Sequence, residues 1–424
     1  MTTTAMAAAR KRAYELPIEQ IDVSDIELFR DDTVWPYFER LRKEDPVHYC
    51  ANSKYGPFWS ITRYKDIMSV DTNHRAFSSE DGITIQIRSG GLPTPGFIAM
   101  DPPRHDEQRR TVSPIVSPGN LANLEQTIRT RVCAILDSLP VGEPFNWVEK
   151  VSIELTTQML ATLFDFPFED RHLLTYWSDV ATTDVNAGGP IDSNEKKMAV
   201  LGQCLAYFTR LWNERVNAAP GNDLISMLAH SPSTRNMDPK EFLGNIILLI
   251  VGGNDTTRNS ISGGVWFLNQ NPDQYRKLRE NPQLIPSMVS EVIRYQTPLA
   301  HMRRTATVDT EIGGKTIKAG DKVVMWYASG NRDEEAIENP ESFLIDRARP
   351  RQHISFGFGI HRCVGNRLAE MQLRVLWEEI LKRGRVIEVV GQPERVMSNF
   401  VRGYASLPVR IRPALGPDLS PKQI

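Results

Sequence analysis

Apolar residues recur every three or four positions along most of the chain, in segments separated by loops that contain proline or glycine. This interval places side chains on one face of an α-helix, so the pattern predicts a mainly helical protein. One long helix is expected over residues 239–270, where the apolar letters NIILLIVGG precede the polar letters NDTTRN. Strand patterns are short, and we expect strands at residues 59–62, 316–317, 322–326 and 407–411. The predicted fold class is mainly α with a minor β portion.

The chain shows no internal repeat and no break in composition. We therefore expect one domain over residues 16–415, with a disordered N-terminal tail at residues 1–15 and a C-terminal tail at residues 416–424. A long, mostly uncharged loop between residues 82 and 103 interrupts the helical pattern. Loops of this length inside compact enzymes usually serve function.

Composition and charge narrow the range of partners. Apolar residues make up 41% of the chain and charged residues 24%, and 50 basic against 52 acidic side chains give a net charge of -2. These values are typical of soluble globular proteins and indicate neither nucleic acid nor a membrane surface as partner. The longest apolar run, Ile246 to Val251, is far shorter than the roughly 20 residues that span a membrane. The four cysteines stand far apart, which argues against a disulfide framework or a zinc site and favours the cytoplasm.

The letters SFGFGIHRCVGNRLAE at residues 355–370 place Cys363 among glycines and directly before a helical pattern. Unpaired N–H groups and the dipole at a helix N-terminus stabilise a thiolate. Gly359 and Gly365 would let the backbone approach a flat, bulky group beside the sulfur. The alternative is a small buried side chain in a glycine-rich turn.

Four positions of FGFGIHRCVG, residues 356–365, match the signature Phe-x-x-Gly-x-x-x-Cys-x-Gly: Phe356, Gly359, Cys363 and Gly365. In this stretch the chain resembles the cytochrome P450 haem-thiolate monooxygenases. The resemblance implies the single-domain P450 fold, with haem b (iron protoporphyrin IX) buried between a long central helix and the cysteine loop. It also implies that Cys363 is the axial iron ligand.

The letters GGNDTT at residues 252–257 put polar side chains inside an apolar helix, which is costly unless they find partners or water. One explanation is that Thr side chains bond back to the preceding turn and bend the helix. The letters also resemble the oxygen-binding motif of the same family. That resemblance implies that Thr256 binds dioxygen and that Asp255 supplies protons from solvent.

Further motifs follow in the family's order, and the resemblance covers residues 16–415. Glu291 and Arg294, one helical turn apart, match its Glu-x-x-Arg pair, which implies a buried scaffold pair with Arg347 as third member. Leu344 stands where the family often has Asp, so this local contact departs from the pattern.

The letters DPPRHDEQRR predict a helix capped by Asp101, with Pro102 at its first position. His105 and Arg109 then share one face of that helix. By resemblance, these two residues, Arg304 and His361 bind the haem propionates.

The substrate pocket is expected to be apolar, because Leu248, Val251 and Gly252 fall by steps of three and four on the face that carries Asp255 and Thr256. The remaining expected pocket residues, from the long loop and two later turns, are Leu92, Ile98, Leu299, Ala300 and Phe400. A pocket without charge favours an unactivated hydrocarbon as substrate.

Four segments, FIAMDPPRHDEQRR, LIVGGNDTTRNS, PLAHMRRTA and SNFVRGYASLPVR, resemble bacterial P450s that hydroxylate the terminal carbon of medium-chain n-alkanes and fatty acids. The steroid side-chain hydroxylases are the nearest alternative. A peroxide-using or isomerising haem enzyme and a haem-binding sensor are alternatives of other classes. Asp255 with Thr256 favours a monooxygenase over them.

The source of electrons is expected outside this chain, since no cysteine cluster or flavin pattern accompanies the haem motifs. The resemblance implies a separate ferredoxin with its ferredoxin reductase, and a monomeric protein. Arg110, Arg362 and Arg367 form a candidate docking patch for an acidic ferredoxin, or are ordinary surface arginines.

Overall fold

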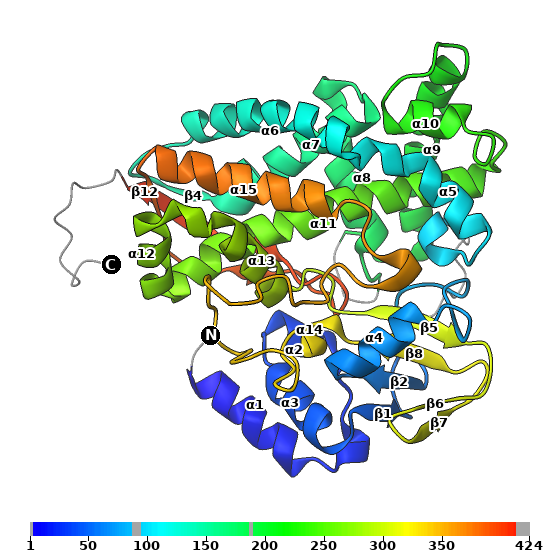
Figure 1. Cartoon of the computed structure of the whole chain (residues 1–424), viewed down its shortest axis with the longest axis vertical. Helices are drawn as coiled ribbons and strands as arrows, with labels where there is room; N and C mark the ends of the chain where they lie inside the picture. Colours follow the sequence, from blue (N-terminus) through cyan, green and yellow to red (C-terminus); the bar gives the residue numbers. More distant parts are fainter. Residues whose placement is uncertain (1–2, 87–94, 186–189, 413–424) are drawn as a thin grey trace.

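The computed structural model describes residues 3–86, 95–185 and 190–412. A large helical part lies beside a smaller part that holds the N-terminal helices and most of the β-structure (Figure 1). The helices are α1 Thr3–Glu15, α2 Ile26–Arg30, α3 Trp35–Glu44, α4 Tyr64–Thr72, α5 Arg104–Val112, α6 Pro118–Ser138, α7 Glu154–Phe164, α8 His172–Thr182, α9 Asn194–Val216, α10 Leu224–His230, α11 Pro239–Gln270, α12 Pro272–Glu280, α13 Ile285–Gln296, α14 Tyr327–Gly330 and α15 Asn366–Lys382. The expected mainly α fold with a minor β portion is confirmed.

The central helix, α11, coincides with the helix predicted over residues 239–270. Its start is well defined, because the Asp238 carboxylate accepts hydrogen bonds from the backbone N–H groups of Lys240 and Glu241, and Pro239 occupies the first turn. The helix runs through the middle of the molecule (Figure 1) and packs against α7, α8, α13 and α15. It is therefore placed to carry side chains into the interior.

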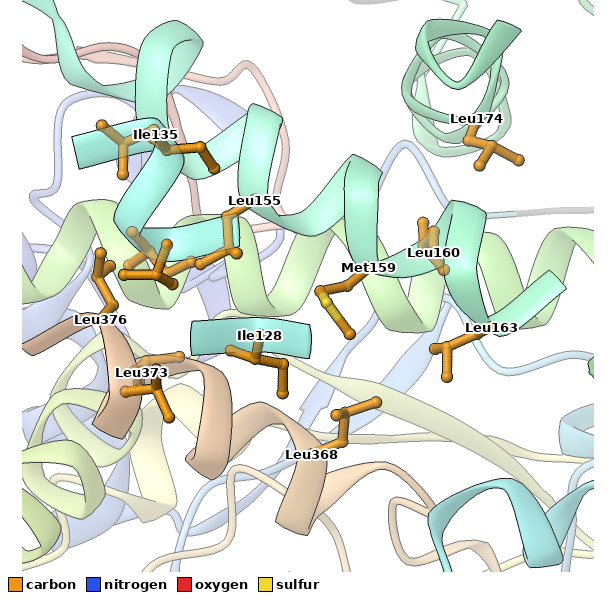
Figure 2. Close-up of a cluster of buried hydrophobic side chains, with 14 of the residues drawn as sticks. Ile128, Ile135, Leu155, Met159, Leu160, Leu163, Leu174, Leu368, Leu373 and Leu376 are labelled. Atoms are coloured by element: carbon orange, nitrogen blue, oxygen red, sulfur yellow. The ribbon is translucent and has the colours of Figure 1, made fainter. Parts of the chain in front are cut away.

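Apolar side chains join α15, the helix that follows the cysteine loop, to the neighbouring helices. Figure 2 shows Leu368, Leu373 and Leu376 of α15 lying close to Ile128 of α6, with Met159 of α7 beyond. All five are buried, and burying a side chain of this size stabilises the fold by about 1.5–3 kcal/mol. This core fixes the direction in which the chain leaves Cys363.

The β-structure contains a five-stranded sheet in the order β1-β2-β8-β5-β3, and β2 and β8 pair in parallel with Trp59 opposite Val323. The strands are β1 Val47–Cys50, β2 Phe58–Ile61, β3 Phe77–Ser78, β4 Pro144–Asn146, β5 Met302–Ala306, β6 Thr310–Ile312, β7 Lys315–Ile317, β8 Lys322–Met325, β9 Val386–Val389, β10 Glu394–Arg395, β11 Tyr404–Ser406 and β12 Pro408–Arg412. The expected strands correspond to β2, β7, β8 and β12, shifted by at most one residue at their ends.

The N-terminal segment differs from its prediction: residues 3–15 form helix α1 rather than a disordered tail. Its alanine-rich sequence has high helix propensity. Ala13 is fully buried, and Arg10 and Tyr14 donate hydrogen bonds to Glu39 of α3 at 2.5 and 3.4 Å. Contacts with α3 therefore order a segment that carries no long apolar run of its own.

The expected C-terminal tail at residues 416–424 lies outside the described residues. Among the helices that the structure describes, none combines the length and the apolar character needed to cross a bilayer.

Candidate active site

The cysteine loop turns back on itself before α15 begins at Asn366. Gly357 and Gly359 have φ values of +65° and +66°, which L side chains rarely adopt. A Cβ atom on Gly359 would lie 2.4 Å from the backbone oxygen of Asp71, so only glycine lets the loop contact α4 this closely. The Cys363 N–H donates to the Phe356 oxygen at 2.8 Å. These contacts hold Cys363 at a fixed point just before the helix.

Cys363 borders two adjoining hollows, which share Arg109, Phe356 and Gly357 in their linings. The residue is exposed to these hollows, yet protein surrounds it, and this burial raises the pKa of the thiol. A hydrogen bond from Gly365 and the charges of Arg109 and Arg362 act in the opposite direction. A cation bound on the open side of the sulfur would favour the thiolate further.

One of the two, the apolar hollow, is lined by residues of α11 and of the cysteine loop. Ile98, Leu248, Gly252 and Leu299, four of the residues expected to contact substrate, line it. Phe356, Gly365, Arg304 and Thr256 line it too. Apolar residues that the sequence analysis did not single out complete the wall: Phe97, Val112, Ile115, Met159, Leu160, Leu163, Leu249, Pro298 and Met302.

Three other expected pocket residues do not line this hollow. Residues of an α-helix that are four apart share a face, so Leu248, Gly252 and Thr256 point into the hollow, whereas Val251 lies one step round the helix with Asp255. The assignment of Val251, and of Asp255 to that same face, is therefore corrected.

Ala300 and Phe400 are corrected for a different reason. The Ala300 side chain belongs to the N-terminal apolar cluster that includes Trp326. Its backbone N–H donates to the Phe400 oxygen at 2.8 Å, and a β-bridge joins Leu299 to Val401. The two segments thus support each other, and Leu299 reaches the hollow whereas Ala300 and Phe400 do not. Leu92 lies outside the described residues.

Thr256 faces the hollow, and its hydroxyl donates to the Gly252 oxygen at 2.9 Å. The bond back to the preceding turn, which the sequence analysis offered as a structural explanation, is therefore present. The hydroxyl oxygen retains lone pairs, so it can still accept a hydrogen bond from a group in the hollow.

Asp255 is fully buried on the side of α11 that packs against α8. Its carboxylate accepts hydrogen bonds from Ser178 at 3.2 Å and Thr182 at 3.4 Å. Arg258 lies 2.9 Å from it and bridges to Asp179, also at 2.9 Å. Burial raises the pKa of Asp255 to about 6 against the opposing charge of Arg258. The group can therefore take up and release a proton near neutral pH.

The side chains expected to bind haem propionates lie close together at one edge of the hollow. The ring centroids of His105 and His361 are 4.4 Å apart. Arg109 and Arg304 line the hollow, and Arg109 donates to the backbone oxygen of Arg362. His105 does not line the wall but sits directly behind His361.

Two buried nitrogen atoms in this group, His105 Nε2 and His361 Nδ1, have no hydrogen-bond partner among the described residues. Burial lowers the pKa of His361 to about 2, so its ring is neutral. The ring contacts the Ser79 hydroxyl at Nε2, 3.0 Å away. When the hydroxyl donates there, the ring hydrogen sits on Nδ1 and can bond a carboxylate. With two guanidinium groups alongside, these residues fit the carboxylates of haem.

Asp101 serves a different purpose from the predicted helix cap. Helix α5 begins at Arg104, and its N-cap residue, Pro103, has no side chain that can accept a bond. The Asp101 carboxylate instead accepts the Ser79 N–H at 3.1 Å. Asp101 therefore orders the residue that contacts His361.

The structure brings together Glu291, Arg294 and Arg347 in the interior, with Glu291 fully buried. Two Arg294 nitrogen atoms each lie 2.8 Å from Glu291, and Arg347 lies 2.9 Å from it. The Leu344 backbone N–H also donates to Glu291 at 2.8 Å. The departure from the family pattern at Leu344 therefore leaves this contact intact, because it uses only the backbone.

Comparison with known proteins places this site in a family. The model of the family described as Cytochrome P450 matches residues 196–410. The chain belongs to the cytochrome P450 family, and it is a haem-dependent monooxygenase. Haem b at this site supplies the iron at which dioxygen is activated. Cys363 is the candidate ligand that would hold this iron, and Thr256 of α11 lines the same hollow.

Two relatives and one solved structure cover nearly the whole chain. Linalool 8-monooxygenase of Pseudomonas putida is 37% identical over 93% of this chain and 100% of its own length. The methyl-branched lipid omega-hydroxylase of Mycobacterium tuberculosis is 31% identical over 93% of this chain and 95% of its own. The structure of CYP153D17 from Sphingomonas sp. PAMC 26605 is 49% identical, with a TM-score of 0.89 over 93% of this chain and 100% of that one.

Proposed function

We propose that the enzyme hydroxylates the terminal carbon of medium-chain n-alkanes or fatty acids, with electrons from a separate ferredoxin and its reductase. The observation that carries the proposal is the wall of the apolar hollow. Ile98, Leu248 and Met302 are among its many aliphatic and aromatic side chains, and the polar groups that α11 adds to it are the uncharged hydroxyls of Thr256, Thr257 and Ser260.

Arg109 and Arg304, the charged side chains that line the hollow, are assigned to the haem carboxylates. The rest of the wall therefore selects substrates by shape and buried area, since it offers no charged group to orient a polar molecule. Burying each CH₂ group contributes about 0.8 kcal/mol. A chain of eight carbons therefore gains roughly 6 kcal/mol from transfer alone, before the costs of association. The names of two relatives, a linalool 8-monooxygenase and a methyl-branched lipid omega-hydroxylase, also describe oxygen insertion into apolar molecules.

The test is product analysis with n-octane, a medium-chain fatty acid and a sterol, each supplied at equal concentration. A surrogate ferredoxin, its reductase and NADH deliver electrons, and the products are separated by gas chromatography with mass spectrometry. We expect 1-octanol or the omega-hydroxy acid as the main product. Turnover of the sterol alone would show that the enzyme is a steroid hydroxylase, and products that form only with added peroxide would show a peroxide-using enzyme.

A matched pair of variants tests whether the apolar wall selects the chain. Leu248→Phe enlarges a side chain that lines the hollow, whereas Val251→Leu enlarges one on the neighbouring face of α11. We expect the first variant to shift the preferred chain length or the hydroxylated carbon. The second should leave both unchanged, and equal shifts in the two variants would contradict the assignment of this wall.

The proposed ferredoxin surface is the second, more polar hollow that Cys363 borders. Its lining includes Arg351, Arg362 and Arg367 with a single carboxylate, Glu370. Of the candidate patch residues, Arg362 and Arg367 line this hollow and Arg110 does not, although all three are exposed. An excess of positive charge close to the iron ligand suits an acidic electron donor.

Charge reversal at Arg367 tests this surface without altering the residues that bind Cys363. We expect Arg367→Glu to weaken ferredoxin binding about tenfold at low ionic strength, with a smaller effect at high salt. Arg276→Glu on α12, far from the cysteine loop in Figure 1, is the control. Equal losses in the two variants would place the ferredoxin elsewhere.

A further inference from the structure

Asp71, near the end of α4, lies behind the haem site and was not singled out by any sequence motif. Its side chain is only 3% exposed. One carboxylate oxygen, Oδ1, accepts a hydrogen bond from Arg304 at 2.9 Å. The other, Oδ2, accepts from the Tyr327 hydroxyl and from the Phe358 N–H, both at 2.7 Å. A single buried carboxylate thus joins three segments that are far apart in sequence.

All three segments border the hollow assigned to haem, through Arg304, Tyr327 and Gly357. Arg304 on β5 is one of the two guanidinium groups that line the hollow. Phe358 belongs to the loop that ends at Cys363. Directly beyond Phe358, the loop meets the Asp71 backbone, where Gly359 leaves no room for a Cβ atom. Both the side chain and the backbone of Asp71 therefore set the position of the cysteine loop.

In the hydrogen bond between Tyr327 and Asp71, the tyrosine is the donor and the carboxylate is the acceptor. Burial raises the pKa of Tyr327 well above its usual range, so the hydroxyl keeps its proton and donates to Asp71. Burial also raises the pKa of Asp71, while the Arg304 charge and the two other donors favour the ionised carboxylate. Three donors surround two oxygens, and each donor reaches Asp71 from a different element.

We propose that Asp71 is a positioning residue for haem. It holds the Arg304 guanidinium toward the haem carboxylates. It also holds the cysteine loop in the position from which Cys363 reaches the iron. The proposal rests on the haem site and is independent of the substrate. A failure of the terminal-hydroxylation proposal would leave it intact, and the reverse is also true.

Asp71 acts by holding the Arg304 head group in place before haem binds. An arginine side chain has several rotatable bonds, and a partner that fixes its head group reduces the entropy lost when it binds a second carboxylate. Partners that orient the residues around a metal group typically change affinity 10- to 100-fold when they are removed. We expect an effect of that size on the dissociation constant of haem.

The experiment uses the haem-loaded protein and three variants. Asp71→Asn keeps an acceptor for the Phe358 N–H but removes the charge that faces Arg304, and Tyr327→Phe removes one donor without changing charge. Asp66→Asn alters a partly exposed carboxylate on the same helix and serves as the control. Haem transfer to an excess of apomyoglobin measures the loss of haem, and far-ultraviolet circular dichroism checks folding.

We expect haem loss 10 to 100 times faster in Asp71→Asn, a smaller change in Tyr327→Phe, and none in Asp66→Asn. We also expect the reduced, carbon monoxide-treated Asp71→Asn protein to show less of the red-shifted Soret band of thiolate-ligated haem. A folded Asp71→Asn protein that keeps its haem and its full Soret band would overturn the proposal. So would lower thermal stability with an unchanged rate of haem loss, because that pattern describes a merely structural residue.

A double-mutant cycle separates the action through Arg304 from a general effect on folding. If Asp71 acts by orienting Arg304, then Asp71→Asn should accelerate haem loss much less in an Arg304→Ala background than in the wild type. Fully additive effects on haem loss would refute this part of the proposal. The cycle needs only haem-transfer rates, so it requires neither a substrate nor a ferredoxin.

Discussion

The tight contact between the cysteine loop and α4 predicts that Gly359→Ala damages the protein more than an alanine in an equally left-handed turn. At φ +66° an alanine costs about 1–2 kcal/mol from its backbone conformation alone. The added Cβ would lie 2.4 Å from the Asp71 oxygen and 3.1 Å from the Thr72 Cα. Both are backbone atoms, so one segment must move, and overpacking of this kind costs about 1–3 kcal/mol more.

Gly314 provides the matched control, because its φ is +75° and no atom lies within 4 Å of the Cβ that an alanine would add there. Gly314→Ala should therefore lower the free energy of unfolding by about 1–2 kcal/mol, and Gly359→Ala by about 2–5 kcal/mol. Urea unfolding followed by circular dichroism measures the difference, and the Soret spectrum of the carbon monoxide complex reports the haem ligand. Equal losses of stability in the two variants, with equal Soret bands, would refute the contact.

Three further predictions concern α11 and the buried ion pair. Thr256→Ala should divert electrons from product into hydrogen peroxide, and Thr256→Ser, which keeps the hydroxyl, should largely preserve product yield per NADH. On the proposal that Asp255 supplies protons to the reaction, product formation in a single turnover should slow as pH rises through about 6, because burial raises the pKa of Asp255 to about 6 and only its protonated form can donate; Asp255→Asn should lower the rate roughly 10²- to 10⁴-fold and abolish this inflection. Glu291→Gln should destabilise the protein by about 3–5 kcal/mol, measured by urea unfolding, because it leaves the buried charge of Arg294 without its carboxylate.

The outcomes that would contradict these predictions are specific. Unchanged peroxide yield in Thr256→Ala would remove the hydroxyl from the reaction. An inflection near pH 6 that persists in Asp255→Asn would assign the titration to another group. A change in stability below 1 kcal/mol for Glu291→Gln would mean that Arg294 finds other partners, such as the backbone oxygens that it already contacts.

Local motifs predicted the parts of the site that lie within short stretches of sequence. The spacing around Cys363 and the Glu291–Arg294 interval are local, because a loop and a helical turn bring these residues together whatever the rest of the chain does. The limits of α11 were also predictable, since Asp238 and Pro239 mark its start in the sequence itself.

Contacts between residues far apart in the sequence could not be predicted from local motifs. Asp71 meets Arg304 and Phe358 across 233 and 287 residues, and no local pattern indicates which carboxylate will be buried beside which loop. The same limit explains the helix at residues 3–15, which is ordered by α3. On α11 the helical spacing was predicted correctly, but the face of two residues was not. Val251 and Asp255 were expected on the face of Gly252 and Thr256, whereas they lie one residue round the helix, on the neighbouring face.

The backbone pairing near Leu299 has a consequence for changing what the enzyme oxidises. Leu299 touches the hollow, but its position is set by Val401 through a β-bridge and by the Ala300 bond to Phe400. Because backbone pairing joins the two turns, a substitution in one turn changes the effect of a substitution in the other. The effects of such substitutions should therefore combine non-additively. Variant libraries that randomise one turn at a time would miss combinations in which each change is acceptable only beside the other, so the two turns are best diversified together.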